Sequence, residues 1–189
     1  MSRIQAFDPL GVQGAGRLLQ LAWLVGGVIV LAVSSRIAIP MVPVPITLQT
    51  LAVTLIGALY GWRLGGLTVA AWLLAAALGL PLLSDGAGGL EPFAGATAGY
   101  LFAFPLAAVL VGVLTARGWD GGRPLRAFAA MLAGNALCLT LGAAWLAAQI
   151  GPAVALEAGV IPFLPGAVIK SAVAAGVLVA LYRTAMRRA

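Results

Sequence analysis

Long apolar segments alternate with short polar ones along almost the whole chain. Each apolar run approaches the roughly 20 residues that a helix needs to cross a bilayer, although the second and third are short and meet around Gly61. The pattern predicts an all-α membrane protein in which residues 1–189 form one integral membrane domain, a compact bundle of six transmembrane helices. The predicted helices cover residues 18–35, 46–60, 64–80, 97–116, 127–150 and 166–182.

The arginines are distributed very unequally between the two sides that six crossings would create. The far side holds Arg36 with the acidic residues Asp85, Glu91 and Glu157. Basic residues beside membrane helices concentrate on the cytoplasmic side. The distribution therefore predicts that both termini are cytoplasmic (N-in, C-in). The side of the termini holds nine arginines: Arg3, Arg17, Arg63, Arg117, Arg123, Arg126, Arg183, Arg187 and Arg188.

The three segments predicted to face outside are the irregular ones. Residues 36–50 contain three prolines, residues 80–100 are rich in glycine, and residues 150–165 contain three more prolines. All three segments are apolar enough to stay at the membrane. Irregular backbone at membrane depth is tolerated where protein or a water-filled cavity satisfies its polar groups. We therefore expect these segments to border a site that opens to the outside.

Composition excludes an ordinary soluble domain. Hydrophobic residues make up 62% of the chain and charged residues 8%, against about 45–50% and 25% in soluble domains. The net charge of +6 comes from short arginine clusters between apolar runs, which indicates membrane topology rather than nucleic-acid binding. The single cysteine, Cys138, lies in an apolar run and is interpreted as a small core residue.

Several kinds of chemistry lack the residues they need. The chain has no histidine and one cysteine, so neither a Ser-His or Cys-His relay nor a histidine metal site can be built. No P-loop surrounds Lys170, and no acidic residue lies in the middle of a predicted helix. We expect no enzyme activity, no cofactor and no metal. The missing intramembrane carboxylates also disfavour a secondary transporter that works alone.

Polar groups gather at the outer ends of otherwise apolar segments. Lys170 is the only lysine and stands just inside the last apolar run. A charge there is costly and predicts a functional site, although a lysine near a helix end can also reach the interface by snorkelling. Hydroxyl and amide groups among apolar walls are typical of a small-molecule site. The other candidates are Thr47 and Gln49, which could instead cap or join helices, and Asp85, Thr97 and Tyr100.

Four motifs in this order resemble the BioY type, the biotin-specific substrate-binding (S) subunits of energy-coupling-factor (ECF) vitamin transporters. The resemblance covers roughly residues 30–184. The motifs are VPITLQTLAV (44–53), GALYGWRLGGLTVAAWLLAAALGLPLL (57–83), GGLEPFAGATAGYLFAF (88–104) and PFLPGAVIK (162–170).

The resemblance implies a subunit of the bacterial inner membrane that captures biotin outside. A transmembrane coupling subunit and ATPase subunits would then drive its delivery inward. The chain departs from the family pattern at Ala167, where many members have an acid, and in the loop that reads Ser84, Asp85, Gly86. Carried over by position, the biotin-binding residues are Gln49, Asp85, Thr97, Tyr100 and Lys170, supported by Thr47, Gly99 and Gly166.

Other interpretations stay open from the sequence. An S subunit for another vitamin, a stand-alone transporter or facilitator for biotin, and a structural membrane protein without a ligand are the alternatives. The end of biotin that would face Lys170 is equally open, and the subunit could form a homo-oligomer. In the first helix, Ala22 and Gly26 form a small-xxx-small pair that could pack on a coupling subunit.

Overall fold

The protein is an all-helical bundle with one two-residue strand pair. A computed structural model describes residues 8–187, so Arg3 and Arg188 lie outside the described residues. The long helices are α1 (Arg17–Arg36), α2 (Gln49–Ala77), α3 (Ala98–Ala116), α4 (Pro124–Ile150) and α6 (Leu164–Met186). The shorter elements are β1 (Ala38–Ile39), β2 (Ile46–Thr47), η1 (Ser84–Gly86), η2 (Glu91–Phe93), α5 (Pro152–Gly159) and η3 (Ile161–Phe163).

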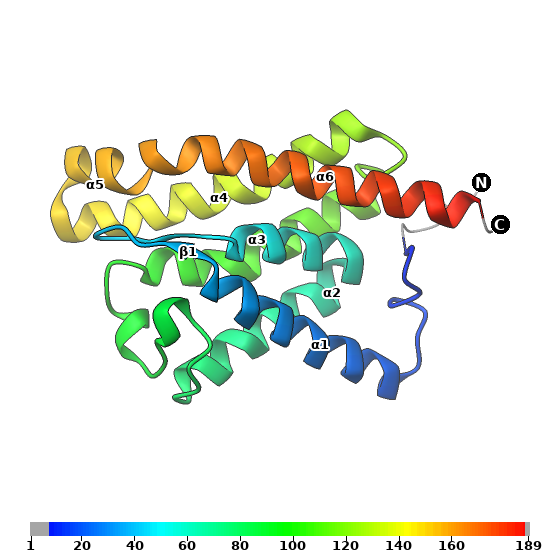
Figure 1. The fold of residues 1–189 in the computed structure, drawn as a ribbon, viewed down its shortest axis with the longest axis horizontal. Helices are drawn as coiled ribbons and strands as arrows, with labels where there is room; N and C mark the ends of the chain where they lie inside the picture. The colour runs from blue at the N-terminus through cyan, green and yellow to red at the C-terminus, as the bar shows by residue number, and fades with distance from the viewer. Residues whose placement is uncertain (1–7, 188–189) are drawn as a thin grey trace.

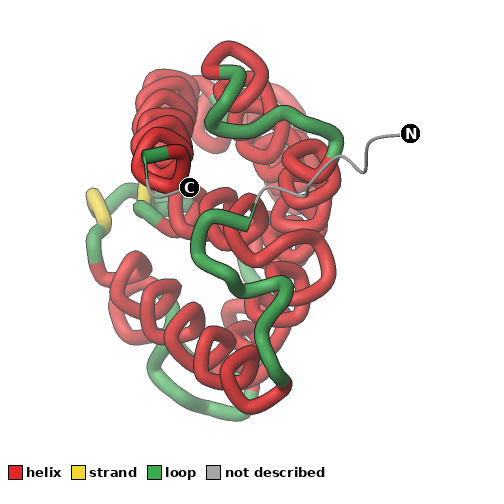
Figure 2. The backbone as a smooth tube through the Cα atoms, turned by 90° about the vertical axis from the view of Figure 1, so that its right-hand side faces the viewer, coloured by secondary structure: helices red, strands yellow, loops and turns green. Residues whose placement is uncertain are grey.

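The two ends of the bundle differ in what they carry (Figure 1). At one end, called here the arginine end, α1 begins, α3 connects to α4, and α6 finishes. At the opposite end, called the loop end, lie the β1–β2 pair, the connection from α2 to α3, and α5. Viewed from the arginine end, the helices stand side by side in one bundle (Figure 2). The connections that the sequence predicted to face opposite sides of the membrane therefore lie at opposite ends of the bundle.

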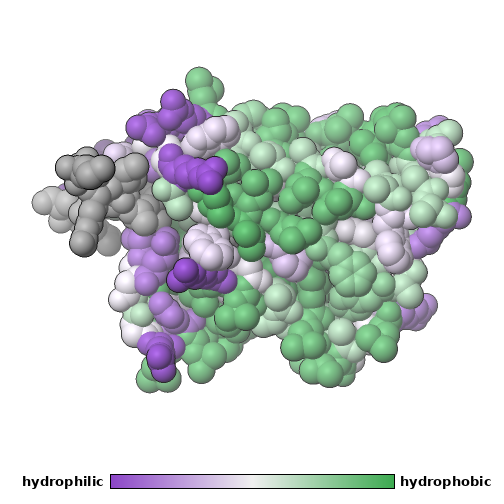
Figure 3. All heavy atoms as spheres, turned by 180° about the vertical axis from the view of Figure 1, so that it is seen from behind, coloured by the Kyte–Doolittle hydropathy of each residue, from purple (hydrophilic) through white to green (hydrophobic). Residues whose placement is uncertain are grey.

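An apolar belt surrounds the middle of the molecule. Seen from behind, hydrophobic side chains cover the central part of the surface, and hydrophilic ones gather toward the two ends (Figure 3). Within residues 8–187, five helical stretches are long and apolar enough to cross a membrane: α1, α2, α3, α4, and residues 152–186 with α6. Exposed leucine, valine and isoleucine side chains are stable on this belt only in lipid. The protein is a multi-pass membrane protein.

Helix α2 contains a sharp backbone break where the sequence predicted two helices, 46–60 and 64–80. Gly61 has φ 77° and ψ 168°, which is not helical. A Cβ built on Gly65 would lie 3.0 Å from the Cα of Gly57, whereas eight residues of straight helix span about 12 Å. The two halves of α2 therefore fold back on each other as a hairpin. Only glycine adopts this positive φ without strain.

Small residues let the helices of the bundle approach closely. A Cβ on Gly57 would collide with the backbone of Ala108 in α3. A Cβ on Gly112 of α3 would lie 2.6 Å from the Cα of Trp62 in α2. Close approach of backbones through small residues is the usual packing mode in membranes, because lipid gives no hydrophobic driving force between helices. The α2 hairpin is thereby held against α3.

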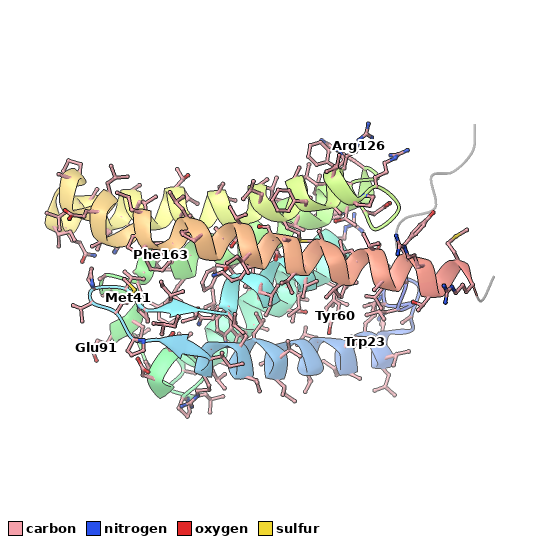
Figure 4. The ribbon with its side chains drawn as sticks, turned by 45° about the horizontal axis from the view of Figure 1, so that its top comes forward. Trp23, Met41, Tyr60, Glu91, Arg126 and Phe163 are labelled. Carbon is pink, nitrogen blue, oxygen red and sulfur yellow. The ribbon has the colours of Figure 1, made fainter. Side chains whose placement is uncertain are left out.

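The loop end is more ordered than its sequence suggested. Residues 152–159, predicted to be irregular, form α5, with Pro152 at its first turn, where a missing N–H costs nothing. The segment between α1 and α2 contains the β1–β2 pair, in which Ala38 pairs with Thr47. Phe163, Met41 and Glu91, drawn with their side chains in Figure 4, lie at this end, and Arg126 lies toward the other. Three separate parts of the chain thus meet at one end.

Candidate functional site

A cavity of about 460 Å³ lies at the loop end of the bundle. This volume falls within the roughly 300–1,000 Å³ of small-molecule sites. All five predicted ligand-binding residues line it. They come from α2, the α2–α3 connection, α3 and α6: Gln49, Asp85, Thr97, Tyr100 and Lys170, with Thr47 of β2 beside them.

Lys170 lies in the second turn of α6 and is half-buried. Its Nζ donates a hydrogen bond of 3.0 Å to the backbone carbonyl of Thr47. Within residues 8–187, no carboxylate forms an ion pair with it, Asp85 included. A carbonyl compensates a buried ammonium only partly. Lys170 is therefore a cationic donor available to a ligand inside the cavity.

Gln49 is held by a short chain of hydrogen bonds. The side chain is 5% exposed, its Oε1 accepts the Thr47 hydroxyl at 2.7 Å, and its Nε2 donates to Ser35 Oγ of α1 at 3.0 Å. Ser35 Oγ in turn donates to the Leu31 carbonyl. These bonds tie α1, β2 and α2 together, so Gln49 both lines the cavity and joins helices. The helix-joining role that the sequence offered as an alternative is therefore present, while ligand binding by Gln49 stays a prediction.

Tyr100 forms a wall of the cavity against α4 and α5. Its hydroxyl donates to the Gly159 carbonyl at 2.8 Å, and its ring stacks on Phe163 with centroids 6.2 Å apart. A Cβ on Gly142 would overlap the ring, and one on Gly159 would lie 2.7 Å from the hydroxyl. The glycines thus make room for the aromatic side chain. Tyr100 fixes α5 in place and leaves an aromatic surface for a ligand.

The mouth of the cavity carries its acidic groups. Asp85 is exposed and lies in η1 with φ 54°, a left-handed conformation that aspartate tolerates better than most residues. Glu91 is exposed and also lines the cavity. Thr97 donates to the Pro92 carbonyl at 3.2 Å. Carboxylates at the mouth and an ammonium inside give the cavity an electrostatic polarity.

The supporting glycines and the partner pair lie away from the cavity surface. A Cβ on Gly99 would collide with Trp145 of α4, so Gly99 sets the α3–α4 contact. A Cβ on Gly166 would lie 3.8 Å from Cε of Lys170, which is an ordinary van der Waals contact. In α1, Ala22 is exposed and Gly26 is half-buried. A Cβ on Gly26 would meet nothing within 4 Å. The small-xxx-small pair therefore faces away from the bundle.

Several cavity residues escaped the sequence analysis. Asn135 of α4 is 2% exposed and lines the cavity; the signal was available, since it is the only asparagine in the chain and falls within an apolar run. Cys138 lines the cavity as well as the core. Phe104 and Phe163 give apolar walls, and nothing in their local sequence distinguishes them from ordinary packing residues.

Thr50 carries a buried hydroxyl that has no hydrogen-bond partner among residues 8–187. The other seven threonines in this range all donate, and those in helix interiors bond the carbonyl four residues earlier. Thr50 is the second residue of α2, so the carbonyl four residues before it belongs to β2 and not to the helix. The start of the helix therefore leaves this hydroxyl unpaired.

We expect Thr50→Val to leave the thermal stability of the ligand-free protein unchanged or to raise it. Valine keeps the shape and removes a buried polar group that is otherwise desolvated without compensation. The matched change Thr54→Val removes a hydroxyl that bonds the Thr50 carbonyl at 2.9 Å and should lower stability by about 1 kcal/mol. Thermal unfolding of both variants in detergent tests this, and an equal loss in both would contradict it.

The cavity has the make-up of a small-molecule binding site. Among the described residues, no group of three or more histidine, cysteine or acidic side chains could hold a metal ion. One ammonium, two amides (Gln49 and Asn135) and several hydroxyls converge on a mostly apolar cavity. Such a site selects an amphipathic small molecule with a few hydrogen-bonding groups.

Comparisons with known proteins connect this geometry to a family. The BioY family model matches residues 9–187. The biotin transporter BioY of Rhizobium etli is 38% identical over 155 residues, covering 78% of this chain and 83% of its own length. The biotin transporter BioY2 of Lactococcus lactis subsp. cremoris is 32% identical over 177 residues, 92% of each chain. A crystal structure of the S-component for biotin from an ECF-type ABC transporter matches with TM-score 0.74 and 27% identity, covering 88% of this chain and 92% of that one. The chain belongs to the BioY family.

Proposed function

We propose that this protein is the biotin-binding S-component of an ECF-type importer and that biotin occupies the cavity at the loop end. The observation that carries the proposal is the position of Lys170, a cationic donor without an ion-pair partner among the described residues, inside a cavity of suitable size on the fold of this family. Relatives named as biotin transporters supply the identity of the ligand.

The chemistry of biotin matches the groups that line the cavity. Its thiophane ring is apolar and can pack against Phe104, Phe163 and Leu83. Its urea and its carboxylate both accept hydrogen bonds, and Lys170 can donate to either. The carboxylates of Asp85 and Glu91 at the mouth repel the ligand carboxylate. Electrostatics therefore favour the Lys170 side of the cavity over the acidic mouth for any anionic group.

We further propose six membrane crossings in one integral domain, with both termini in the cytoplasm. The break at Gly61 supports this count, because an α2 of 29 residues would be about 44 Å long if straight, more than a bilayer core needs. We infer that each half of the hairpin crosses the membrane once, in which case Arg63, two residues after the break, lies at the arginine end. Seven of the eight described arginines then lie on the cytoplasmic side, as the positive-inside rule requires. They are Arg17, Arg63, Arg117, Arg123, Arg126, Arg183 and Arg187.

The proposed partners are a transmembrane coupling subunit and ATPase subunits in a bacterial inner membrane. The sequence has no P-loop of its own, so energy from ATP must come through other chains. The outward-facing Ala22 and Gly26 of α1 offer a smooth helix face for the coupling subunit. No cofactor or metal is required by this function, since biotin is the transported ligand.

Equilibrium binding of labelled biotin to the purified subunit tests the proposal. We expect saturable, one-site binding that unlabelled biotin abolishes and that riboflavin or thiamine leaves intact. Competition by one of those vitamins instead of biotin would assign the subunit to another ligand. If protein whose circular dichroism spectrum shows it to be folded binds none of the three vitamins saturably, the proposed function is overturned. Uptake by cells that contain only this chain would contradict the requirement for partners.

A further inference from the structure

Asn135 presents an unusual polar group to the inner part of the cavity. It is the only asparagine in the chain, it lies in the middle of α4, and it is 2% exposed while lining the cavity. A buried amide inside a membrane helix is costly unless its donors and acceptor are satisfied. The partners of its two ends therefore decide what it does.

The nitrogen end of the Asn135 amide is fully engaged within the protein. Nδ2 donates to the Met131 carbonyl at 3.1 Å and to Ser171 Oγ of α6 at 3.1 Å. Ser171 Oγ donates in turn to the Ala167 carbonyl at 2.7 Å. Both protons of Nδ2 are thus used, and the amide is held in one orientation between α4 and α6.

The oxygen end is different. Within residues 8–187, no hydrogen bond reaches Asn135 Oδ1. Only Trp23 Nε1 and Thr50 Oγ1 are both unpartnered and fully buried in this range, so Asn135 Oδ1 must be in contact with open space. Because Asn135 lines the cavity and its nitrogen points to Ser171, its carbonyl oxygen is turned to the cavity. Asn135 Oδ1 is therefore a fixed hydrogen-bond acceptor that has no donor among the described residues.

Among the described residues, no other side chain offers an unengaged amide or carboxylate oxygen in the interior of the cavity. Ala167 offers only a methyl group to the cavity, and Lys170 is a donor. Gln49 already accepts from Thr47 and donates to Ser35. The carboxylates of Asp85 and Glu91 are exposed at the mouth. A ligand N–H in the interior of the cavity therefore meets a carbonyl acceptor chiefly at Asn135.

We propose that Asn135 Oδ1 accepts a hydrogen bond from one ureido N–H of biotin, and that Ser171 is the positioning residue that orients the amide. The inference rests on the proposed function, because it takes biotin as the ligand. A urea presents N–H donors beside its carbonyl, so a fixed acceptor on α4 and the Lys170 ammonium on α6, which line the same cavity, are complementary to one edge of it. Asn135 thereby selects for ligands with an N–H group at this point.

The test measures affinities of the wild-type subunit and of Asn135→Ala for biotin and for two derivatives, each methylated on one ureido nitrogen. Wild-type protein should bind one of the derivatives about 10- to 100-fold more weakly than biotin, since its N–H is lost and the buried acceptor is left unpaired. Asn135→Ala should bind biotin about 10-fold or more weakly and should tolerate methylation of that nitrogen within about threefold. Alanine removes the acceptor and also gives the methyl group room.

Further variants separate this role from a structural one. Asn135→Ala leaves the Ser171 hydroxyl bonded to the Ala167 carbonyl, so no donor is orphaned and the fold should persist. Ser171→Ala should clearly reduce the discrimination between biotin and the methylated derivative, and it should lower thermal stability only slightly. Thr140→Val removes an exposed hydroxyl on the same helix and should change neither affinity.

Two results would overturn the inference while the proposed function stands. One is wild-type protein that binds biotin and both methylated derivatives equally well, an outcome that needs no variant to fold. The other is an Asn135→Ala variant that binds biotin as tightly as wild type does, or that loses as much affinity as wild type does when the ureido nitrogen is methylated. By contrast, wild-type protein that binds no biotin would fail the proposed function itself, so the two failures are distinguishable.

Discussion

Replacing Lys170 by methionine should weaken biotin binding about 100-fold or more while the subunit stays folded. Methionine retains most of the apolar stem and removes the ammonium, which is the only interior cation of the cavity among the described residues. Truncating one member of a buried, hydrogen-bonded charged pair costs about 2–5 kcal/mol, and each 1.4 kcal/mol is tenfold in affinity. Equilibrium binding of labelled biotin to the purified variant measures the loss.

The ligand-free protein should respond in the opposite way. Lys170 has a backbone carbonyl as its partner and no ion pair among residues 8–187, so removing the charge relieves part of its desolvation cost. Thermal stability of Lys170→Met without biotin should therefore equal or exceed that of wild type, and added biotin should no longer raise it. Ile169→Ala, on the exposed face of the same turn, should retain full affinity. Unchanged affinity in Lys170→Met would remove Lys170 from the site.

Gly57→Leu should prevent the bundle from assembling. The Cβ alone would collide with the backbone of Ala108 in α3, and backbone cannot move aside as a flexible side chain can. Overpacking of this kind costs 1–3 kcal/mol or more even where side chains adjust. Because the cavity depends on α2 and α3 lying together, the variant should lose both thermal stability and biotin binding. Size-exclusion profiles and thermal melts of the detergent-solubilised protein measure the effect.

Gly26→Leu is the matched control, because the same substitution in α1 meets open space. A Cβ there would lie within 4 Å of no other group, so the isolated subunit should fold and bind biotin as wild type does. If Ala22 and Gly26 contact the coupling subunit, Gly26→Leu should still reduce co-purification with that partner. A Gly57→Leu protein as stable as wild type would contradict the close α2–α3 packing, and undiminished co-purification of Gly26→Leu would contradict the partner contact.

The long helices and the membrane environment were predictable from the local pattern of apolar and polar residues. The prediction was wrong where that pattern is ambiguous. The apolar runs at 18–35, 97–116, 127–150 and 166–182 correspond to long helices of the structure within a few residues. Residues 152–159 were predicted to be irregular because of their prolines, yet Pro152 begins a helix. The family resemblance was confirmed by the match over residues 9–187.

The candidate site was predicted in part. Lys170 was identifiable because an ammonium in an apolar run has few structural explanations. Asn135 offered a similar but weaker signal, since an amide can also be satisfied by its own helix. The partners of both residues are far away in sequence: the Lys170–Thr47 bond spans 123 residues and the Asn135–Ser171 bond spans 36. Pattern along the chain contains no information on such pairs.

The sequence by itself determined that this chain is a membrane protein, where four of its long helices lie within a few residues, and which family it resembles; the placement of its arginines on one side of the membrane stays a prediction. Those properties depend on hydropathy, charge order and local motif, each readable within a short window. Only the tertiary structure decided that α2 folds back at Gly61, that Lys170 bonds the Thr47 carbonyl, and that Asn135 turns its oxygen to the cavity. These features depend on contacts between backbones and side chains remote in sequence, and such contacts exist only after the helices have packed.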